Sequence, residues 1–171
     1  MRRTVVAAAV LAAVAVPTAP ASAAPAARGG GWEPAPSAPW NVAAGLRCDF
    51  PVHGEPVVDD VVRRVLDTYP DGRPERVAYK GDLVVRLTNT GSGASYDADA
   101  GGTALVEYRP DGSRLWAVHG PVLIGFGENG GTLDRGFYTV DGTYTLETSA
   151  TGYKTLTMLH GSTDALCARI G

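Results

Sequence analysis

The residue types of a hydrolase catalytic triad occur close together near the C-terminus, at His160, Ser162 and Asp164. A triad needs a histidine that contacts both a nucleophile and a carboxylate, and it is assembled in space rather than along the chain. Neighbouring residues of an extended segment project in diverging directions, and the sequence contains no G-x-S-x-G nucleophile elbow. We therefore expect no catalytic residue here, and a secreted hydrolase that uses His160, His53 or His119 is kept as an alternative.

Residues 125–130 read G-x-G-x-x-G, which is the spacing of a dinucleotide-binding loop. Such a loop works only where a helix begins and directs its N-terminus at the pyrophosphate. Another strand-like segment follows instead, so we interpret these glycines as part of a turn. The sequence therefore predicts no cofactor.

Asp97 and Asp99 begin a segment that resembles an EF-hand calcium loop. The fifth position is Gly101, and the twelfth is Tyr108 where a bidentate glutamate is required. An acidic turn between strands is the better interpretation, and we assign no metal ligand. A calcium site of another type, built on Asp97 and Asp99, is left open.

Five aromatic residues could form a platform on which sugar rings stack: Trp116, Tyr108, Tyr138, Tyr144 and Tyr153. On alternating strands, the same residue types more often belong to the core or to a half-buried sheet surface. The platform is therefore an alternative to a packing role.

The elements that must position these residues are short strands separated by turn signals. Leu83, Val85 and Leu87 alternate with polar neighbours, and Pro-Asp-Gly occurs at 70–72 and again at 110–112. Proline and glycine supply the backbone angles that turns require. This pattern predicts an all-β fold, an antiparallel β-sandwich of roughly ten strands.

Two segments with a short polar connection suggest a hairpin near the end of the domain. Phe137–Val140 and Thr143–Thr148 flank Asp141-Gly142, which is a two-residue hairpin signal. We expect the first strand of the domain at 46–52 and the last at 165–170.

The segment 57–66 is ambiguous between strand and helix. Its valines are spaced more like one face of a helix, and Asp59 and Arg63 have helical pair spacing. Its β-branched residues disfavour a helix, and the segment leads directly into the turn at Pro70. We expect a strand, with a helix as the alternative.

An export signal precedes the domain. Arg2 and Arg3 are followed by an apolar run over 4–16 and a small-x-small site that ends at Ala23. The run is shorter than the ~20 apolar residues of a spanning helix. We therefore predict a signal peptide over 1–23, cleavage between Ala23 and Ala24, and a secreted, extracellular product with no membrane attachment.

The segment 24–45 is rich in Ala, Pro and Gly, so we expect a flexible linker before a domain over 46–171. The chain has 15 Lys and Arg against 18 Asp and Glu, a formal net charge of −3. No basic run occurs, so nucleic acid is not an expected partner. A protein or glycan surface suits this charge, although no particular partner is identified.

Cys48 and Cys167 are the 2 cysteines of the chain. An isolated pair in an exported protein most simply forms one disulfide. A metal site or a reactive thiol is the alternative, but two cysteines give too few ligands for structural zinc. We predict a Cys48–Cys167 disulfide.

Several stretches resemble a group of small secreted actinobacterial β-sandwich proteins that have no assigned function: 88–89, 108–113, 141–144, 151–155, 160–161 and Cys167. The resemblance implies no catalytic residue. We therefore predict a secreted, non-catalytic module with an extracellular binding or structural role. A secreted hydrolase and a secreted protease inhibitor are the alternatives, and small inhibitors of that kind usually have more disulfides.

Overall fold

The computed structural model describes residues 30–171. The predicted signal peptide and its cleavage site between Ala23 and Ala24 lie outside the described residues. The described chain forms 12 strands in two antiparallel sheets and one short helix, which confirms the predicted all-β antiparallel fold. None of its helices has the length and apolar character needed to cross a membrane.

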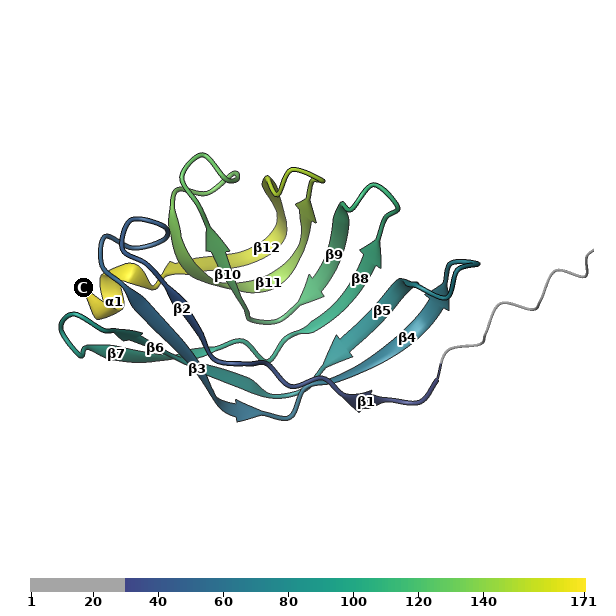
Figure 1. Ribbon diagram of the computed structural model, residues 1–171, viewed down its shortest axis with the longest axis horizontal. Helices are drawn as coiled ribbons and strands as arrows, with labels where there is room; N and C mark the ends of the chain where they lie inside the picture. The colour runs from purple at the N-terminus through teal and green to yellow at the C-terminus, as the bar shows by residue number, and fades with distance from the viewer. Residues whose placement is uncertain (1–29) are drawn as a thin grey trace, which may run out of the picture.

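The larger sheet, sheet A, has eight strands in the order β1-β4-β5-β8-β9-β11-β10, with β12 also paired with β11. Figure 1 shows that sheet A is strongly curved and that the turns after β4, β8, β10 and β11 gather along one rim. Its strands are β1 (Glu33–Pro34), β4 (Val62–Thr68), β5 (Pro74–Lys80), β8 (Thr103–Tyr108), β9 (Arg114–His119), β10 (Val122–Phe126), β11 (Gly136–Thr148) and β12 (Lys154–Ala165).

The smaller sheet, sheet B, has four strands in the order β2-β3-β6-β7. The helix α1 packs beside β6 and β7 (Figure 1). The elements are β2 (Trp40–Val42), β3 (Val52–Asp59), β6 (Leu83–Asn89), β7 (Ser95–Asp99) and α1 (Cys167–Ile170).

Short corners carry the chain from one sheet to the other. β3 continues into β4 through 60–61, β5 into β6 through 81–82, and β7 into β8 through 100–102. Gly81 has a φ of 133°, and a Cβ there would lie 2.3 Å from the carbonyl oxygen of Asp60. Glycine is therefore required at this corner because a side chain would collide with the neighbouring backbone.

The described residues form two hydrophobic clusters, and we call the one between sheet B and the C-terminus the first core. Leu87 of β6 packs with Leu166 and Ile170 at the C-terminus, and all three are almost fully buried. The second cluster lies within the curve of sheet A and includes Val106 and Phe126, which are fully buried. Because sheet A is curved, side chains from its own strands pack against one another and cover much of its apolar face.

The segment 24–45 was expected to be a flexible linker, but its described part contains β1 and β2. Trp40 of β2 stacks on Phe137 with ring centroids 5.1 Å apart, and it packs against Gly54 of β3. The folded unit therefore begins before Leu46. The many Ala, Pro and Gly residues of the segment led to the linker prediction, whereas the side chain of Trp40 packs against the first core.

The predicted first and last strands are also wrong. Residues 46–50 form bends, and the strand β3 begins only at Val52. At the other end, β12 stops at Ala165 and α1 follows. The spacing of four residues between Leu166 and Ile170 lets a single helical turn direct both side chains into the first core.

Residues 57–66 are extended, as predicted. They comprise the end of β3 and the start of β4, separated by the corner at 60–61. The Pro-Asp-Gly turns are present as well, with Gly72 at φ 85° and Gly112 at φ 86°. The predicted hairpin at Asp141-Gly142 is wrong, however, because β11 runs without interruption through it.

Gly142 explains that error. It lies opposite Gly161 of β12, and the two glycines have φ angles of 128° and 133°. The strand pair has a register shift at the next step, between Thr143 and Tyr144. The sequence signal correctly indicates a positive φ, but Gly142 adopts it within a continuous strand, beside a β-bulge, and the chain does not reverse there.

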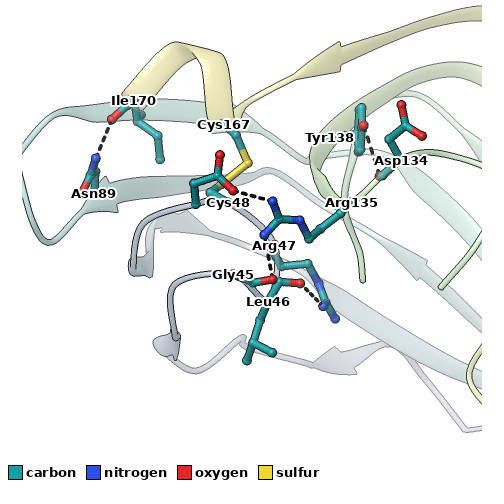
Figure 2. The surroundings of a disulfide bond; sticks show 11 residues. Gly45, Leu46, Arg47, Cys48, Asn89, Asp134, Arg135, Tyr138, Cys167 and Ile170 are labelled. Carbon is teal, nitrogen blue, oxygen red and sulfur yellow. Dashed lines mark hydrogen bonds and ion pairs between the residues drawn. A yellow bond between two sulfur atoms is a disulfide. The ribbon is translucent and has the colours of Figure 1, made fainter. Parts of the chain in front are cut away.

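The predicted disulfide between Cys48 and Cys167 is present, with a Cα–Cα distance of 5.5 Å. Figure 2 shows that it joins the loop before β3 to α1. Arg135 also binds this loop, by donating hydrogen bonds to the carbonyl oxygen of Gly45 and to the carboxylate of Asp49. The loop before β3 and the C-terminal helix are thus fixed to each other, and the loop is also fixed to the start of β11.

Asn89, which is only 5% exposed, fixes α1 from the other side. Its Nδ2 donates to the Ile170 carbonyl oxygen at 3.1 Å (Figure 2). Its Oδ1 accepts from the backbone of Gly91 at 2.9 Å. We predict that Asn89→Ala lowers the free energy of unfolding by about 1–3 kcal/mol, because buried backbone groups lose their partners. Urea denaturation measures this loss.

The matched control is Ser92→Ala, in the same turn but exposed. Its hydroxyl accepts only one long hydrogen bond, of 3.3 Å, from the Ala94 backbone. We expect a change within about 0.5 kcal/mol for this variant. Equal losses in the two variants would show that the Asn89 side chain does not secure α1.

Candidate functional site

The inner face of sheet A is the face that carries the buried side chains of Val106, Val118 and Tyr144. Residues directly opposite each other in an antiparallel ladder project to the same side of the sheet. The register therefore arranges this face in three rows across β8, β9, β11 and β12. They are Tyr108–Arg114–Thr148–Lys154, Val106–Trp116–Leu146–Leu156 and Ala104–Val118–Tyr144–Met158.

A cavity of about 460 Å³ opens on this face next to the turns, and we call it the rim cavity. Its walls include Tyr79 and Tyr108, together with Arg63, Arg109 and Arg114. The volume lies within the range of small-molecule sites, roughly 300–1,000 Å³. The mixture of aromatic rings and guanidinium groups is suited to a ligand that has both a flat apolar face and polar groups.

The aromatic side chains of the rim cavity are linked to one another. Tyr79 stacks on Trp116, with ring centroids 6.3 Å apart and planes only 7° from parallel. The hydroxyls of Tyr79 and Tyr108 share a hydrogen bond of 2.9 Å. Burial, together with this hydrogen bond, raises the pKa of Tyr108 far above its usual range, so its hydroxyl stays protonated.

A second, smaller cavity of about 180 Å³ adjoins the first, and we call it the inner cavity. Trp116, Tyr144 and Lys154 line it, and Arg114 lines both cavities. Lys154 Nζ donates to the carbonyl oxygen of Gly125 at 2.8 Å. Burial lowers the pKa of Lys154 below its usual value, and the nearby positive charges of arginines lower it further.

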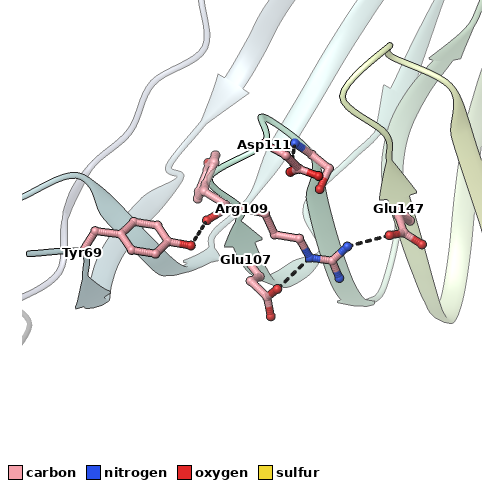
Figure 3. Close-up of polar contacts among 7 residues, drawn as sticks. Tyr69, Glu107, Arg109, Asp111 and Glu147 are labelled. Atoms are coloured by element: carbon pink, nitrogen blue, oxygen red, sulfur yellow. Dashed lines mark hydrogen bonds and ion pairs between the residues drawn. The ribbon is translucent and has the colours of Figure 1, made fainter.

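Most arginines near the rim cavity are neutralised by carboxylates. Arg63 pairs with Glu33 at 2.8 Å. Arg109 donates to Glu107 at 2.8 Å and to Glu147 at 2.7 Å, as Figure 3 shows. The figure also shows the hydroxyl of Tyr69 bonded to the backbone at Tyr108, which ties the β4–β5 turn to β8.

Within residues 30–171, the positive charges of Arg114 and Lys154, unlike those of Arg63 and Arg109, are not paired with carboxylates. Arg114 and Lys154 flank Thr148 in the first row of the inner face. The junction of the two cavities therefore carries positive charge that no described carboxylate balances.

No family model, no curated protein and no solved structure matches the chain. The geometry of its own residues is therefore the basis for what the site can do.

The structure brings together only part of the predicted aromatic platform. Trp116, Tyr108 and Tyr144 share the inner face. Tyr138 instead packs edge-on against Phe126 at 5.8 Å, and Tyr153 lies in the β11–β12 turn, outside both cavities. Tyr79 was not among the aromatic residues predicted for the platform, although it alternates with Val77 on β5 as an inward-facing residue would.

The histidines occupy separate positions on sheet surfaces. His53 Nδ1 forms a hydrogen bond with Asn41 Oδ1 at 2.9 Å, and His119 Nδ1 forms one with Thr143 Oγ1 at 3.0 Å. His160 is exposed on β12. Among the described residues, no hydrogen bond joins a histidine to a carboxylate.

The candidate triad over 160–164 does not come together through hydrogen bonds in the described chain. Asp164 instead accepts hydrogen bonds from Arg169, the shortest at 3.1 Å. Its carboxylate is thus used to hold α1 against the end of β12.

Asp97 and Asp99 have local partners. Both carboxylate oxygens of Asp97 accept from Arg86, at 2.7 and 2.8 Å, and this hydrogen bonding lowers the pKa of Asp97. Asp99 accepts from the backbone of Gly101 at 2.9 Å. Residues 30–171 contain no group of three His, Cys, Asp or Glu side chains arranged to hold a metal ion.

The glycine-rich segment 125–130 is the end of β10 followed by a turn, in which Gly130 donates to the carbonyl oxygen of Gly127 at 3.0 Å. The next regular element is β11 and not a helix. The dinucleotide-binding geometry is therefore not formed here.

Proposed function

We propose that the protein is an extracellular, non-catalytic binding module whose ligand occupies the groove formed by the rim cavity and the inner cavity. The observation that carries this proposal is the stacked pair of Tyr79 and Trp116, which spans the boundary between the two cavities. Both rings are half-buried in sheet A, so they are held rigidly while part of their surface remains available.

A sugar ring is the ligand body that best suits this groove. Aromatic rings offer a flat apolar surface, and their polar edges can form hydrogen bonds with hydroxyl groups. The Tyr108 hydroxyl, which stays protonated, lies beside the stacked pair through its bond to Tyr79. Rigid aromatic surface with a few fixed polar groups is the general composition of small-ligand sites.

The competing hydrolase and inhibitor proposals lack a comparable observation. His53 forms a hydrogen bond with a side-chain amide, and His119 forms one with a hydroxyl. These contacts do not assemble the groups that general acid–base catalysis requires. A binding role needs no such assembly, and it uses the aromatic and charged residues that the inner face actually presents.

The test measures retention of the protein on immobilised cellulose, dextran, polygalacturonate and dextran sulfate. We expect retention on at least one of these polymers, and we expect Trp116→Ala to weaken it roughly 30-fold or more, since buried aromatic anchors dominate binding energies. Melting curves establish that the variant is folded.

Trp32→Ala is the matched control. Trp32 is exposed, lies before β1 under the ammonium of Lys80, and lines neither cavity. We expect unchanged retention for this variant. A folded Trp116→Ala variant that is retained as well as the parent, or retention of the parent by none of the four polymers, would refute the proposal.

A further inference from the structure

Two positive side chains meet where the cavities join. The β-ladder places Arg114 and Lys154 on either side of Thr148, with one strand between them. Adjacent strands lie about 4.8 Å apart, so the two backbone positions are separated by roughly 10 Å. Both side chains line the inner cavity, which brings their charges toward the same space.

This arrangement is unfavourable in the empty groove. The walls beside Lys154 are apolar and include Val122, Ile124 and Leu146. A charge that is removed from water without a counter-charge costs free energy. The lowered pKa of Lys154, to which burial and then the charges of Arg47 and Arg114 contribute, expresses this cost. Two other arginines of the rim cavity, Arg63 and Arg109, avoid it by pairing with glutamates.

A second, independent observation points to a ligand in the same cavity. Tyr144 lines the inner cavity and is 1% exposed. Its hydroxyl has no hydrogen-bond partner among the described residues. Buried polar groups in folded proteins nearly always have partners, and an unsatisfied one costs about 1–3 kcal/mol. Burial raises the pKa of Tyr144, so the hydroxyl is a neutral donor.

We propose that the groove is specific for an acidic sugar whose anionic group binds between Arg114 and Lys154. The sugar ring lies against Trp116, and the Tyr144 hydroxyl forms a further hydrogen bond with the same ligand. This inference rests on the proposed function and deepens it by naming the ligand class. A carboxylate and a sulfate share the chemistry that the two cations recognise, because each presents several oxygens to charged donors.

The experiment compares matched charged and neutral polymers. Polygalacturonate is set against its methyl ester for the carboxylate, and dextran sulfate against dextran for the sulfate. We expect retention on at least one acidic polymer to exceed retention on its neutral counterpart at least 10-fold. The acidic polymer that is retained identifies the anionic group.

Substitutions assign the effect to the groove. Arg114→Gln, Lys154→Gln and Tyr144→Phe are each expected to weaken retention on the acidic polymer, the two charge variants at least 10-fold. Lys80→Gln removes the same charge outside both cavities and is expected to leave retention unchanged. Lys154→Arg keeps the charge and is expected to retain more binding than Lys154→Gln.

The possible failures are distinguishable. If neutral and acidic polymers bind equally and Trp116→Ala still abolishes binding, the acidic-sugar inference is wrong and the proposed function stands. If Lys80→Gln weakens binding as much as Arg114→Gln, the attraction is a general charge effect and the inference is also wrong. If no polymer is retained, the proposed function itself fails.

Discussion

Replacement of both disulfide cysteines, Cys48→Ser with Cys167→Ser, is expected to lower the free energy of unfolding by about 2–5 kcal/mol. The bond connects residues 119 positions apart in sequence, so its loss frees a long loop in the unfolded chain. It also releases α1, whose single turn is too short to be stable without the contacts of Leu166 and Ile170 in the first core.

Urea denaturation of the parent protein, with and without a thiol reductant, provides the measurement. The parent should become less stable in the reductant, whereas the double-serine variant should be insensitive to it. A loss below about 1 kcal/mol would show that Arg135 and Asn89 are sufficient to hold the loop before β3 and α1 in place.

Gly161→Ala is expected to cost about 3 kcal/mol or more. Gly161 has a φ of 133°, and a Cβ there would lie 2.0 Å from the carbonyl oxygen of Asp141 on the neighbouring strand. The unfavourable φ alone costs about 1–3 kcal/mol. The collision adds to it, because Asp141 belongs to the backbone of β11 and cannot rotate away. The bulge between β11 and β12 would have to open.

Gly152→Ala separates the two contributions. Gly152 also has a positive φ, of 89°, but no atom lies within 4 Å of the position that its Cβ would take. We expect this variant to lose only about 1 kcal/mol, from the unfavourable φ. Urea denaturation of both variants gives the comparison, and similar losses would mean that the backbone contact at Gly161 is unimportant.

Local signals were sufficient for the fold class and for several turns. The alternation at Leu83, Val85 and Leu87 correctly predicts β6, and the Pro-Asp-Gly sequences correctly predict two hairpin turns. The disulfide followed from the presence of one cysteine pair. Each of these features depends on a few neighbouring residues or on composition, which a sequence displays directly.

The errors arise where distant residues decide the structure. Asp141-Gly142 has the chemistry of a turn, but Gly142 pairs with Gly161 of the next strand and keeps its positive φ inside a continuous strand. Trp40 lies in a segment that is otherwise typical of a linker, and its partner Phe137 is almost a hundred residues away. Tertiary packing overrides the local preference at both positions.

The candidate site was only partly predictable for the same reason. Trp116, Tyr108 and Tyr144 were predicted as part of an aromatic platform, but nothing in the local sequence shows that they share one face with Tyr79. The pairing of β5 with β8 and of β8 with β9 creates that neighbourhood. The charged pair of Arg114 and Lys154 depends on the register of β11 with both of its neighbours.

The three corners at 60–61, 81–82 and 100–102 bear on how the molecule unfolds. At each corner, one continuous segment of the chain passes from a strand of one sheet into a strand of the other. Separation of the strands of one sheet therefore also disturbs the strands of the other. Separate domains joined by a linker can open one at a time, whereas this connectivity favours a single cooperative transition. The proposed binding groove of sheet A therefore shares its stability with the disulfide that joins the loop before β3 to α1.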